Sequence, residues 1–193
     1  MKRHDLIKQN LISAARQLFI KFGFEKTTMN EIAEEARKGK SSLYYYFTSK
    51  EEIFQAVVEY EADILKNNII QAMENCKSAE EKLRTYVLTR FKGIKELGNL
   101  YNALRNDFLD NLDFIRQIRM KYDDLEKKKI QEIIEEGLST GIFSIENPEE
   151  ITETIQMTLK AVELPLLLNY ETDVFTQKIN SLLNIFFNGI KNK

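Results

Sequence analysis

Three consecutive tyrosines, Tyr44–Tyr46, follow closely on the run Lys40-Ser41-Ser42 in the first quarter of the chain. Successive residues of a helix are turned by about 100°, so a helix cannot bury all three rings. An exposed tyrosine hydroxyl beside lysine suits a phosphate oxygen, and serine reaches phosphates or base edges. These residue types indicate contact with a nucleic acid.

The charge distribution points the same way. The chain has 193 residues and a net charge of −2. Residues 1–50 hold ten Lys and Arg against five acids, whereas the remainder holds 18 basic and 25 acidic residues. A basic end on an acidic body suggests a localised contact with a polyanion, with chance clustering of surface charge as the alternative.

Composition argues against most catalytic chemistry. The single cysteine, Cys76, excludes an intramolecular disulfide and a cysteine-cluster metal site. The single histidine, His4, provides no Ser-His or Cys-His pair unless the N-terminal end folds into a site. A di-iron bundle using Glu132 and Glu136 would need two Glu-x-x-His motifs. We therefore expect no enzyme, no catalytic or metal-binding residues and no cofactor.

No segment resembles a membrane span. The densest apolar stretch, Leu164–Leu168, is far shorter than the roughly 20 residues that cross a bilayer. No apolar signal segment follows the basic start of the chain. The expectation is a soluble, cytoplasmic protein with no membrane partner.

The elements that must position the tyrosines are helices. Two prolines and seven glycines leave few breaks, and apolar residues recur at three- and four-residue steps, which predicts an all-α fold of about nine helices. Asp5 is the expected cap of the first helix and Gly23 its end. Thr28 with Glu31, Ser49 with Glu52 and Ser78 with Glu81 form capping boxes, and Asn147 is the expected cap of a later helix. The predicted helices cover about 5–22, 28–36, 41–47, 49–73, 78–95, 99–110, 113–137, 147–166 and 172–189.

The second and third helices, with the tight turn between them, form a candidate helix-turn-helix over about 28–47. Such a unit needs a small helix whose inner face packs in a core while its outer face stays free for the major groove. Leu43 and Phe47, four residues apart, are the expected inner face.

An ordered set of motifs runs through this region: Ile12–Phe19 (ISAARQLF), Gly23-Phe24, Thr27–Ala36 (TTMNEIAEEA), Lys40–Phe47 (KSSLYYYF) and Ser49–Phe54 (SKEEIF). With these motifs, residues 6–60 resemble the TetR family of bacterial transcriptional regulators. The resemblance implies a helix-turn-helix DNA-binding domain at 1–50 and a helical ligand-binding and dimerisation domain at 51–193. It further implies a homodimeric repressor that a small-molecule effector releases from double-stranded DNA with an inverted-repeat (palindromic) operator.

The resemblance also assigns residue roles. Lys40, Ser41 and Ser42 approach bases, Tyr45 packs on a base, and the remaining positions serve phosphates. The DNA-binding residues that the resemblance implies are Thr28, Lys40, Ser41, Ser42, Tyr44, Tyr45, Tyr46 and Lys50. Lys38 departs from the family pattern, and it is added to the expected DNA-binding residues because its charge would strengthen phosphate binding.

The body should hold an effector pocket and a dimer surface. Five aromatic residues of the middle helices are candidates for the pocket, with ordinary core packing as the alternative: Tyr86, Phe91, Tyr101, Phe108 and Tyr122. Arg105 is a polar candidate that could orient a ligand, with a solvated face as the alternative. The apolar stripes of the last two helices exceed what one small body needs, which predicts a four-helix dimer interface. Its expected residues are Ile151, Ile155, Leu159, Val162, Leu166, Phe175, Ile179, Leu182 and Phe186.

One position departs from the family pattern, which has glycine directly after the alanine at 36. This chain has Arg37, Lys38 and Gly39 there. Either the left-handed turn position moves to Gly39, or Arg37 adopts it at a cost of about 1–2 kcal/mol. Alternative functions are a helical dimeric module that binds a protein, or an all-α enzyme without DNA binding. The first leaves the basic, tyrosine-rich quarter unexplained.

Overall fold

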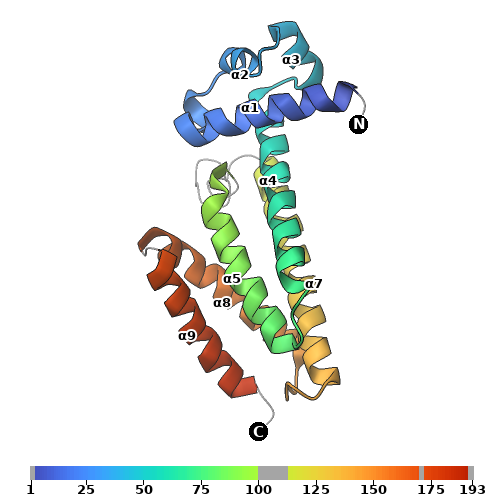
Figure 1. Ribbon diagram of the computed structural model, residues 1–193, viewed down its shortest axis with the longest axis vertical. Helices are drawn as coiled ribbons and strands as arrows, with labels where there is room; N and C mark the ends of the chain where they lie inside the picture. Colours follow the sequence, from blue (N-terminus) through green and yellow to red (C-terminus); the bar gives the residue numbers. More distant parts are fainter. Residues whose placement is uncertain (1–2, 100–112, 170–171, 191–193) are drawn as a thin grey trace. The chain divides into compact units, whose positions relative to one another are not determined.

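The computed structural model describes residues 3–99, 113–169 and 172–190, and every regular element in these ranges is an α-helix (Figure 1). The eight helices are α1 (Arg3–Lys26), α2 (Met29–Glu35), α3 (Lys40–Tyr46), α4 (Lys50–Met73), α5 (Ala79–Glu96), α7 (Asp113–Ser139), α8 (Pro148–Asn169) and α9 (Thr172–Ile190). The all-α prediction is confirmed. The helix expected over 99–110 lies almost entirely outside the described residues.

The chain forms two compact units. The first comprises the described residues up to Ile64 together with 97–99 and 113–115, and the second comprises Leu65–Glu96 and the described residues from Arg116 onward. Helix α4 therefore begins in the first unit and ends in the second. The functional division between residues 50 and 51 stays a prediction.

In the first unit, α1 packs on α2 and α2 packs on α3. Its core contains fully buried aromatic side chains, with the Phe19 ring 5.1 Å from that of Phe54 in an edge-to-face contact. Leu43 and Phe47 are buried as predicted and hold α3 to this core. A short helix such as α3 is marginal by itself, so these contacts give it its stability.

In the second unit, α5 packs against α8 and α9. At Gly137, in α7, a Cβ atom would come within 2.0 Å of Cδ2 of Phe143, so only glycine allows this ring to reach the helix. The Phe143 ring in turn stacks on that of Phe187.

Most helix starts follow the local signals of the sequence. Four capping residues each accept a bond from the amide three residues later, as predicted: Thr28 from Glu31, Ser49 from Glu52, Ser78 from Glu81 and Asn147 from Glu150. The cap predicted at Asp5 is wrong, because α1 already begins at Arg3 and Asp5 lies in its first turn. Gly23, with φ of 83°, interrupts α1 as expected, although a short helical stretch continues to Lys26.

Candidate nucleic-acid interface

The turn between α2 and α3 is a Schellman motif with arginine in the left-handed position. Arg37 has φ of 52°, whereas Gly39 has φ of −66°. The amide of Arg37 donates to the carbonyl of Glu34 and that of Lys38 to the carbonyl of Ala33, both at 2.9 Å, which is the bonding pattern of this motif. Arg37 therefore adopts the left-handed conformation, and the alternative that Gly39 adopts it is wrong.

A long-range contact fixes this turn to the first helix. The side-chain amide of Asn10 donates to the carbonyl of Ala36 at 3.1 Å. The carbonyl at the end of α2 is thus satisfied by α1, and the direction in which the chain leaves α2 is held from outside the turn. This contact contributes to the orientation of α3.

Helix α3 exposes the tyrosine run. The exposed fraction is 74% for Tyr45 and 44% for Tyr44, and Tyr46 is half-buried. Lys40 and Ser41 are also exposed, with Nζ of Lys40 lying 6.0 Å from the centroid of the Tyr44 ring. The outer face of α3 therefore presents an ammonium group, hydroxyls and a protruding aromatic ring, which can bond phosphates and pack on bases.

Three other proposed contact residues differ in how available their side chains are. Lys38 and Ser42 are half-exposed. Thr28 caps α2, but its hydroxyl donates to Oε2 of Glu31 at 2.7 Å, so its proton is already engaged. The same hydroxyl and the Thr28 amide hold the pKa of the Glu31 carboxyl below its usual value.

Lys50 begins α4 and makes contacts that its sequence position does not reveal. Its Nζ donates to the carbonyls of Phe24 at 2.8 Å and Glu25 at 3.2 Å, and lies 4.4 Å from the centroid of the Phe24 ring. In this structure the ammonium group joins the start of α4 to the end of α1. Its contact with DNA stays a prediction.

Sequence reasoning missed the N-terminal turn of α1 as a neighbour of the tyrosines. The ring of His4 lies 4.6 Å from that of Tyr46 and 6.0 Å from that of Tyr45. Lys8, one turn later, places Nζ 5.6 Å from the centroid of the Phe47 ring. Helical periodicity puts His4 and Lys8 on one face of α1, but it does not say what that face contacts.

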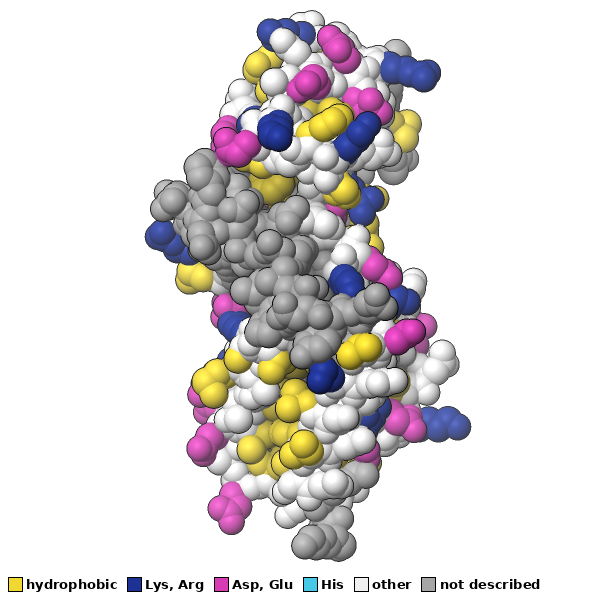
Figure 2. All heavy atoms as spheres, turned by 90° about the vertical axis from the view of Figure 1, so that its left-hand side faces the viewer, with side chains coloured by type: hydrophobic (Ala, Val, Ile, Leu, Met, Phe, Trp, Pro, Cys, Tyr) yellow, Lys and Arg dark blue, Asp and Glu magenta, His cyan; other side chains and the backbone are white. Residues whose placement is uncertain are grey.

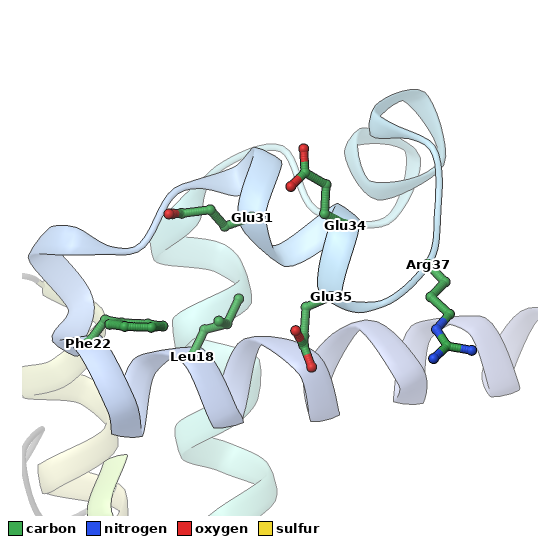
Figure 3. Close-up of a pocket in the computed structure, with 6 residues that line it drawn as sticks. All are labelled: Leu18, Phe22, Glu31, Glu34, Glu35 and Arg37. Carbon is green, nitrogen blue, oxygen red and sulfur yellow. The ribbon is translucent and has the colours of Figure 1, made fainter.

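An acidic pocket of about 440 Å³ lies elsewhere on the same unit, between α1 and α2 (Figure 3). Leu18 and Phe22 of α1 line it, together with the carboxylates of Glu31, Glu34 and Glu35 and the side chain of Arg37. Three carboxylates against one guanidinium repel phosphates, so this surface is unsuited to DNA.

In the second unit, three proposed pocket residues are described. Tyr86 is buried, and its hydroxyl donates to Oε1 of Glu126 at 3.3 Å; burial, followed by the Glu126 charge, raises the pKa of Tyr86 far above its usual value. Arg90 forms an ion pair with Glu126, Phe91 is fully buried and Tyr122 is half-buried. The side chains of Tyr101, Arg105 and Phe108 lie outside the described residues. The effector pocket stays a prediction.

The predicted dimer stripe divides into two groups. Ile155, Leu159 and Ile179 are buried within the single chain and belong to its own core. Others are half-exposed: Ile151, Val162, Leu182 and Phe186. The side chains of Leu166 and Phe175 lie outside the described residues. The sequence did not single out Met157 and Ile185, whose exposed fractions are 66% and 73%.

Neither metal binding nor membrane insertion finds support in the described ranges. They contain no group of three or more His, Cys, Asp or Glu side chains that could hold a metal ion. None of their helices is long and apolar enough to cross a membrane.

These features define a class of protein: an all-α chain whose helix-turn-helix exposes the polar and aromatic face of a short helix for DNA. The model of the bacterial regulatory proteins of the tetR family matches residues 11–57. An uncharacterised HTH-type transcriptional regulator of Lactococcus lactis is 30% identical over 151 residues, covering 72% of this chain and 73% of the relative. The negative transcriptional regulator IcaR of the Staphylococcus aureus biofilm operon is 28% identical over 143 residues, covering 65% and 75%.

A solved structure extends the similarity over the whole chain. The crystal structure of a transcriptional regulator from Cytophaga hutchinsonii has a TM-score of 0.82 and 27% identity, covering 95% of this chain and 98% of that one. The chain belongs to the tetR family and is a DNA-binding transcriptional regulator. By their names these relatives are regulators of transcription rather than enzymes.

Proposed function

We propose that the protein is a homodimeric repressor that binds an inverted-repeat operator through α3 and leaves it when a small molecule binds in the second unit. The observation that carries this proposal is the division of α3 into two faces. Leu43 and Phe47 are buried, whereas Tyr45 protrudes beside the exposed Lys40 and Ser41. Negative regulation by the relative IcaR supports repression rather than activation.

Dimerisation is supported by apolar side chains that the single chain leaves in solvent. Met157 of α8 and Val174 and Ile185 of α9 are exposed, and Leu182 and Phe186 are half-exposed. Figure 2 shows hydrophobic side chains gathered on the face formed by these C-terminal helices. Exposed apolar surface of this kind marks interaction sites, and a two-fold reader of an inverted repeat needs a second copy.

The release mechanism is supported by a buried polar network in the first unit. Glu61 of α4 is fully buried and accepts from Nε of Arg16 at 2.8 Å and from Nδ2 of Asn99 at 2.9 Å. Asn99 also donates to the carbonyl of Arg16 at 3.2 Å. One carboxylate thus joins α1, α4 and residue 99, which directly precedes the segment of the predicted pocket residue Tyr101. An effector whose binding disturbed this network would alter the support of α1 and α4, and with it the spacing of the two α3 helices.

The first experiment measures binding to duplex DNA from upstream of the gene, with a scrambled duplex of equal length as reference. Tyr45→Ala should weaken binding to the specific duplex by about 1–3 kcal/mol and leave the scrambled duplex nearly unaffected. Tyr60→Ala, which removes another exposed tyrosine on α4, is the matched control and should change neither. Equal losses on both duplexes would contradict base reading by Tyr45.

The second experiment tests the dimer by sedimentation. Ile185→Asp should shift the wild-type dimer towards monomer, because a carboxylate would have to be desolvated in an apolar interface. Lys128→Ala, at an exposed position of α7, should leave the mass unchanged. A wild-type chain that sediments as a monomer at micromolar concentration would refute the dimer.

The third experiment tests the switch by a thermal-shift screen of small molecules followed by DNA titrations. A compound that raises Tm should lower operator affinity by about 5- to 150-fold, and operator DNA should lower the affinity for the compound by the same factor. Compounds that stabilise the protein yet leave operator affinity unchanged would argue against an effector-controlled repressor.

A further inference from the structure

The first turn of α1 and the end of α3 share a cluster of three aromatic rings. His4 packs at 4.6 Å from Tyr46 and 6.0 Å from Tyr45, and the two tyrosine rings lie 5.1 Å apart in an edge-to-face arrangement. The side chain of His4 is 56% exposed, so the imidazole sits at the surface beside the tyrosines rather than beneath them. We call these residues the His4 cluster.

We propose that His4 is a further DNA-contacting residue, whose protonated imidazole binds a backbone phosphate next to the one bound by the tyrosines. The inference rests on the proposed role of Tyr45 and Tyr46 at the DNA surface. A side chain in ring contact with both tyrosines reaches the phosphates that they reach, because neighbouring phosphates of one strand are only a few ångströms apart. The sequence adds positive charge here, since Lys2 and Arg3 directly precede His4.

One carboxylate and two tyrosine rings surround the imidazole. On its own helix, Oδ1 of Asp5 lies 3.8 Å from Nδ1 of His4, and Lys8 follows one turn later with its ammonium group directed at Phe47. From α3 the neighbours are the two tyrosine rings, whose faces attract cations. The ion pair with Asp5 is long and exposed, so it is weak and easily exchanged for a phosphate.

The chain offers an unusually clean readout for this contact. Histidine is the side chain that ordinarily changes charge between pH 5 and 8, and this sequence has one. A change of DNA affinity across that range therefore reports on His4, apart from a contribution of the terminal amino group. Protonation adds a cation at the interface, so affinity should be higher at pH 6 than at pH 8.

The test compares wild type with His4→Phe and His4→Arg on the upstream duplex and its scrambled reference at pH 6 and pH 8. Wild type should bind about fivefold more tightly per protomer at pH 6, the size of a favourable exposed ion pair. His4→Phe keeps an aromatic ring against the tyrosines but carries no charge, so its affinity should be flat with pH and match wild type at pH 8. His4→Arg should be flat and match wild type at pH 6.

Two further readouts separate a phosphate contact from mere packing. At pH 6 the slope of log affinity against log salt should fall by about 0.9 in His4→Phe, the value for one phosphate contact. By NMR, the single imidazole resonance should titrate at higher pH in the DNA complex than in the free protein. Lys128→Ala, distant in sequence and exposed on α7, is the control for loss of a surface cation and should change neither readout.

The possible outcomes separate a failure of the His4 contact from a failure of the proposed operator binding. If His4→Phe retains the pH dependence, or binds as tightly as wild type at pH 6, His4 does not contact phosphate and the proposal is wrong. If wild type shows no preference for the upstream duplex at either pH, operator binding at that site fails instead, and the His4 contact fails with it.

Discussion

The arginine in the left-handed position of the helix-turn-helix predicts different stability effects at two positions only two residues apart. Arg37 has φ of 52°, and Gly39, the N-cap of α3, has φ of −66° and ψ of 149°, which any residue adopts. We expect Arg37→Gly to be more stable than Arg37→Ala, whereas Gly39→Ala should leave the stability nearly unchanged.

The magnitudes follow from the backbone. A residue with a Cβ loses roughly 1–2 kcal/mol in the left-handed region, and glycine avoids this cost. Glycine also makes the unfolded chain more flexible, which takes back about 0.4–1 kcal/mol. The net advantage of Arg37→Gly over Arg37→Ala should therefore be about 1 kcal/mol. Gly39→Ala should gain about 0.4–1 kcal/mol from the unfolded state, and the added Cβ meets its nearest neighbour, Oγ of Ser41, at an unstrained 3.9 Å. Gly39 is also the N-cap of α3, where alanine is less favourable than glycine by a similar amount, so the net change should be small.

Urea unfolding at one fixed protein concentration measures these differences, because the stability of a dimer depends on concentration. In thermal unfolding, 1 kcal/mol corresponds to roughly 2–4 °C for a chain of this size. The comparison with alanine at position 37 removes the arginine side chain from both variants, so it isolates the backbone. If Arg37→Ala is as stable as Arg37→Gly while Gly39→Ala loses roughly 1–2 kcal/mol, the cost of a left-handed residue with a Cβ, then the left-handed residue is Gly39 and the turn described above is wrong.

Three further predictions concern single interactions. Arg16→Leu should lower the free energy of unfolding by about 3–5 kcal/mol because it takes the cationic partner from the fully buried carboxylate of Glu61, and the double change with Glu61→Leu should recover part of the loss. An additive double change would contradict the coupling. Gly137→Ala should lose about 1–3 kcal/mol in urea unfolding, since its Cβ overlaps the Phe143 ring, and Gly137→Ala with Phe143→Leu should be milder. The pKa of Glu31 is lowered in the folded protein, so its carboxylate stabilises the fold at pH values above the ordinary carboxyl pKa, and this stabilisation is lost as the pH falls through the folded pKa. Wild type should therefore be more stable than Glu31→Gln at pH 7, and the difference should vanish in strong acid. A difference that stayed constant with pH would refute this linkage.

Helix starts were predictable because their signals are local. Ser49, Ser78 and Asn147 each lie three residues before the amide that they cap, and an acid follows at the matching position. The inner face of α3 was predictable for the same reason, since Leu43 and Phe47 are one helical turn apart. Asp5 was predicted as a cap because its residue type is typical of a helix start. The prediction is wrong because the chain is already helical two residues earlier.

The turn and the surroundings of the site depend on contacts that no local pattern encodes. Whether Arg37 or Gly39 takes the left-handed position depends on the direction of α3, which Asn10 helps to fix through the carbonyl of Ala36 from 26 residues away. Lys50 finds its carbonyl partners equally far back in the chain. Contacts between residues so far apart in the sequence could not be predicted from local patterns.

The apolar stripes of α8 and α9 illustrate a different limit. Periodicity identifies the face that avoids water, but the same pattern serves the chain's own core and a partner's surface. Ile179 is fully buried within one chain, while Ile185 in the same helix is 73% exposed. Burial in the single chain separates the two uses: it removes Ile179 from the proposed dimer surface and adds Ile185, which the predicted stripe did not include.

The whole-chain charge of −2 does not oppose DNA binding, because residues 1–50 hold ten Lys and Arg against five acids. His4, at the N-terminal end of α1, contacts the tyrosines of α3, whereas Leu18 and Phe22, near the other end, border the carboxylates of α2 (Figure 3). His4 and Leu18 are 14 positions apart, a separation of about 21 Å along a helix. We expect the carboxylates of α2 to disfavour phosphates at their end of the unit, so that approach with α3 towards the duplex is favoured. On this hypothesis the acids of α2 contribute to orientation without contacting DNA.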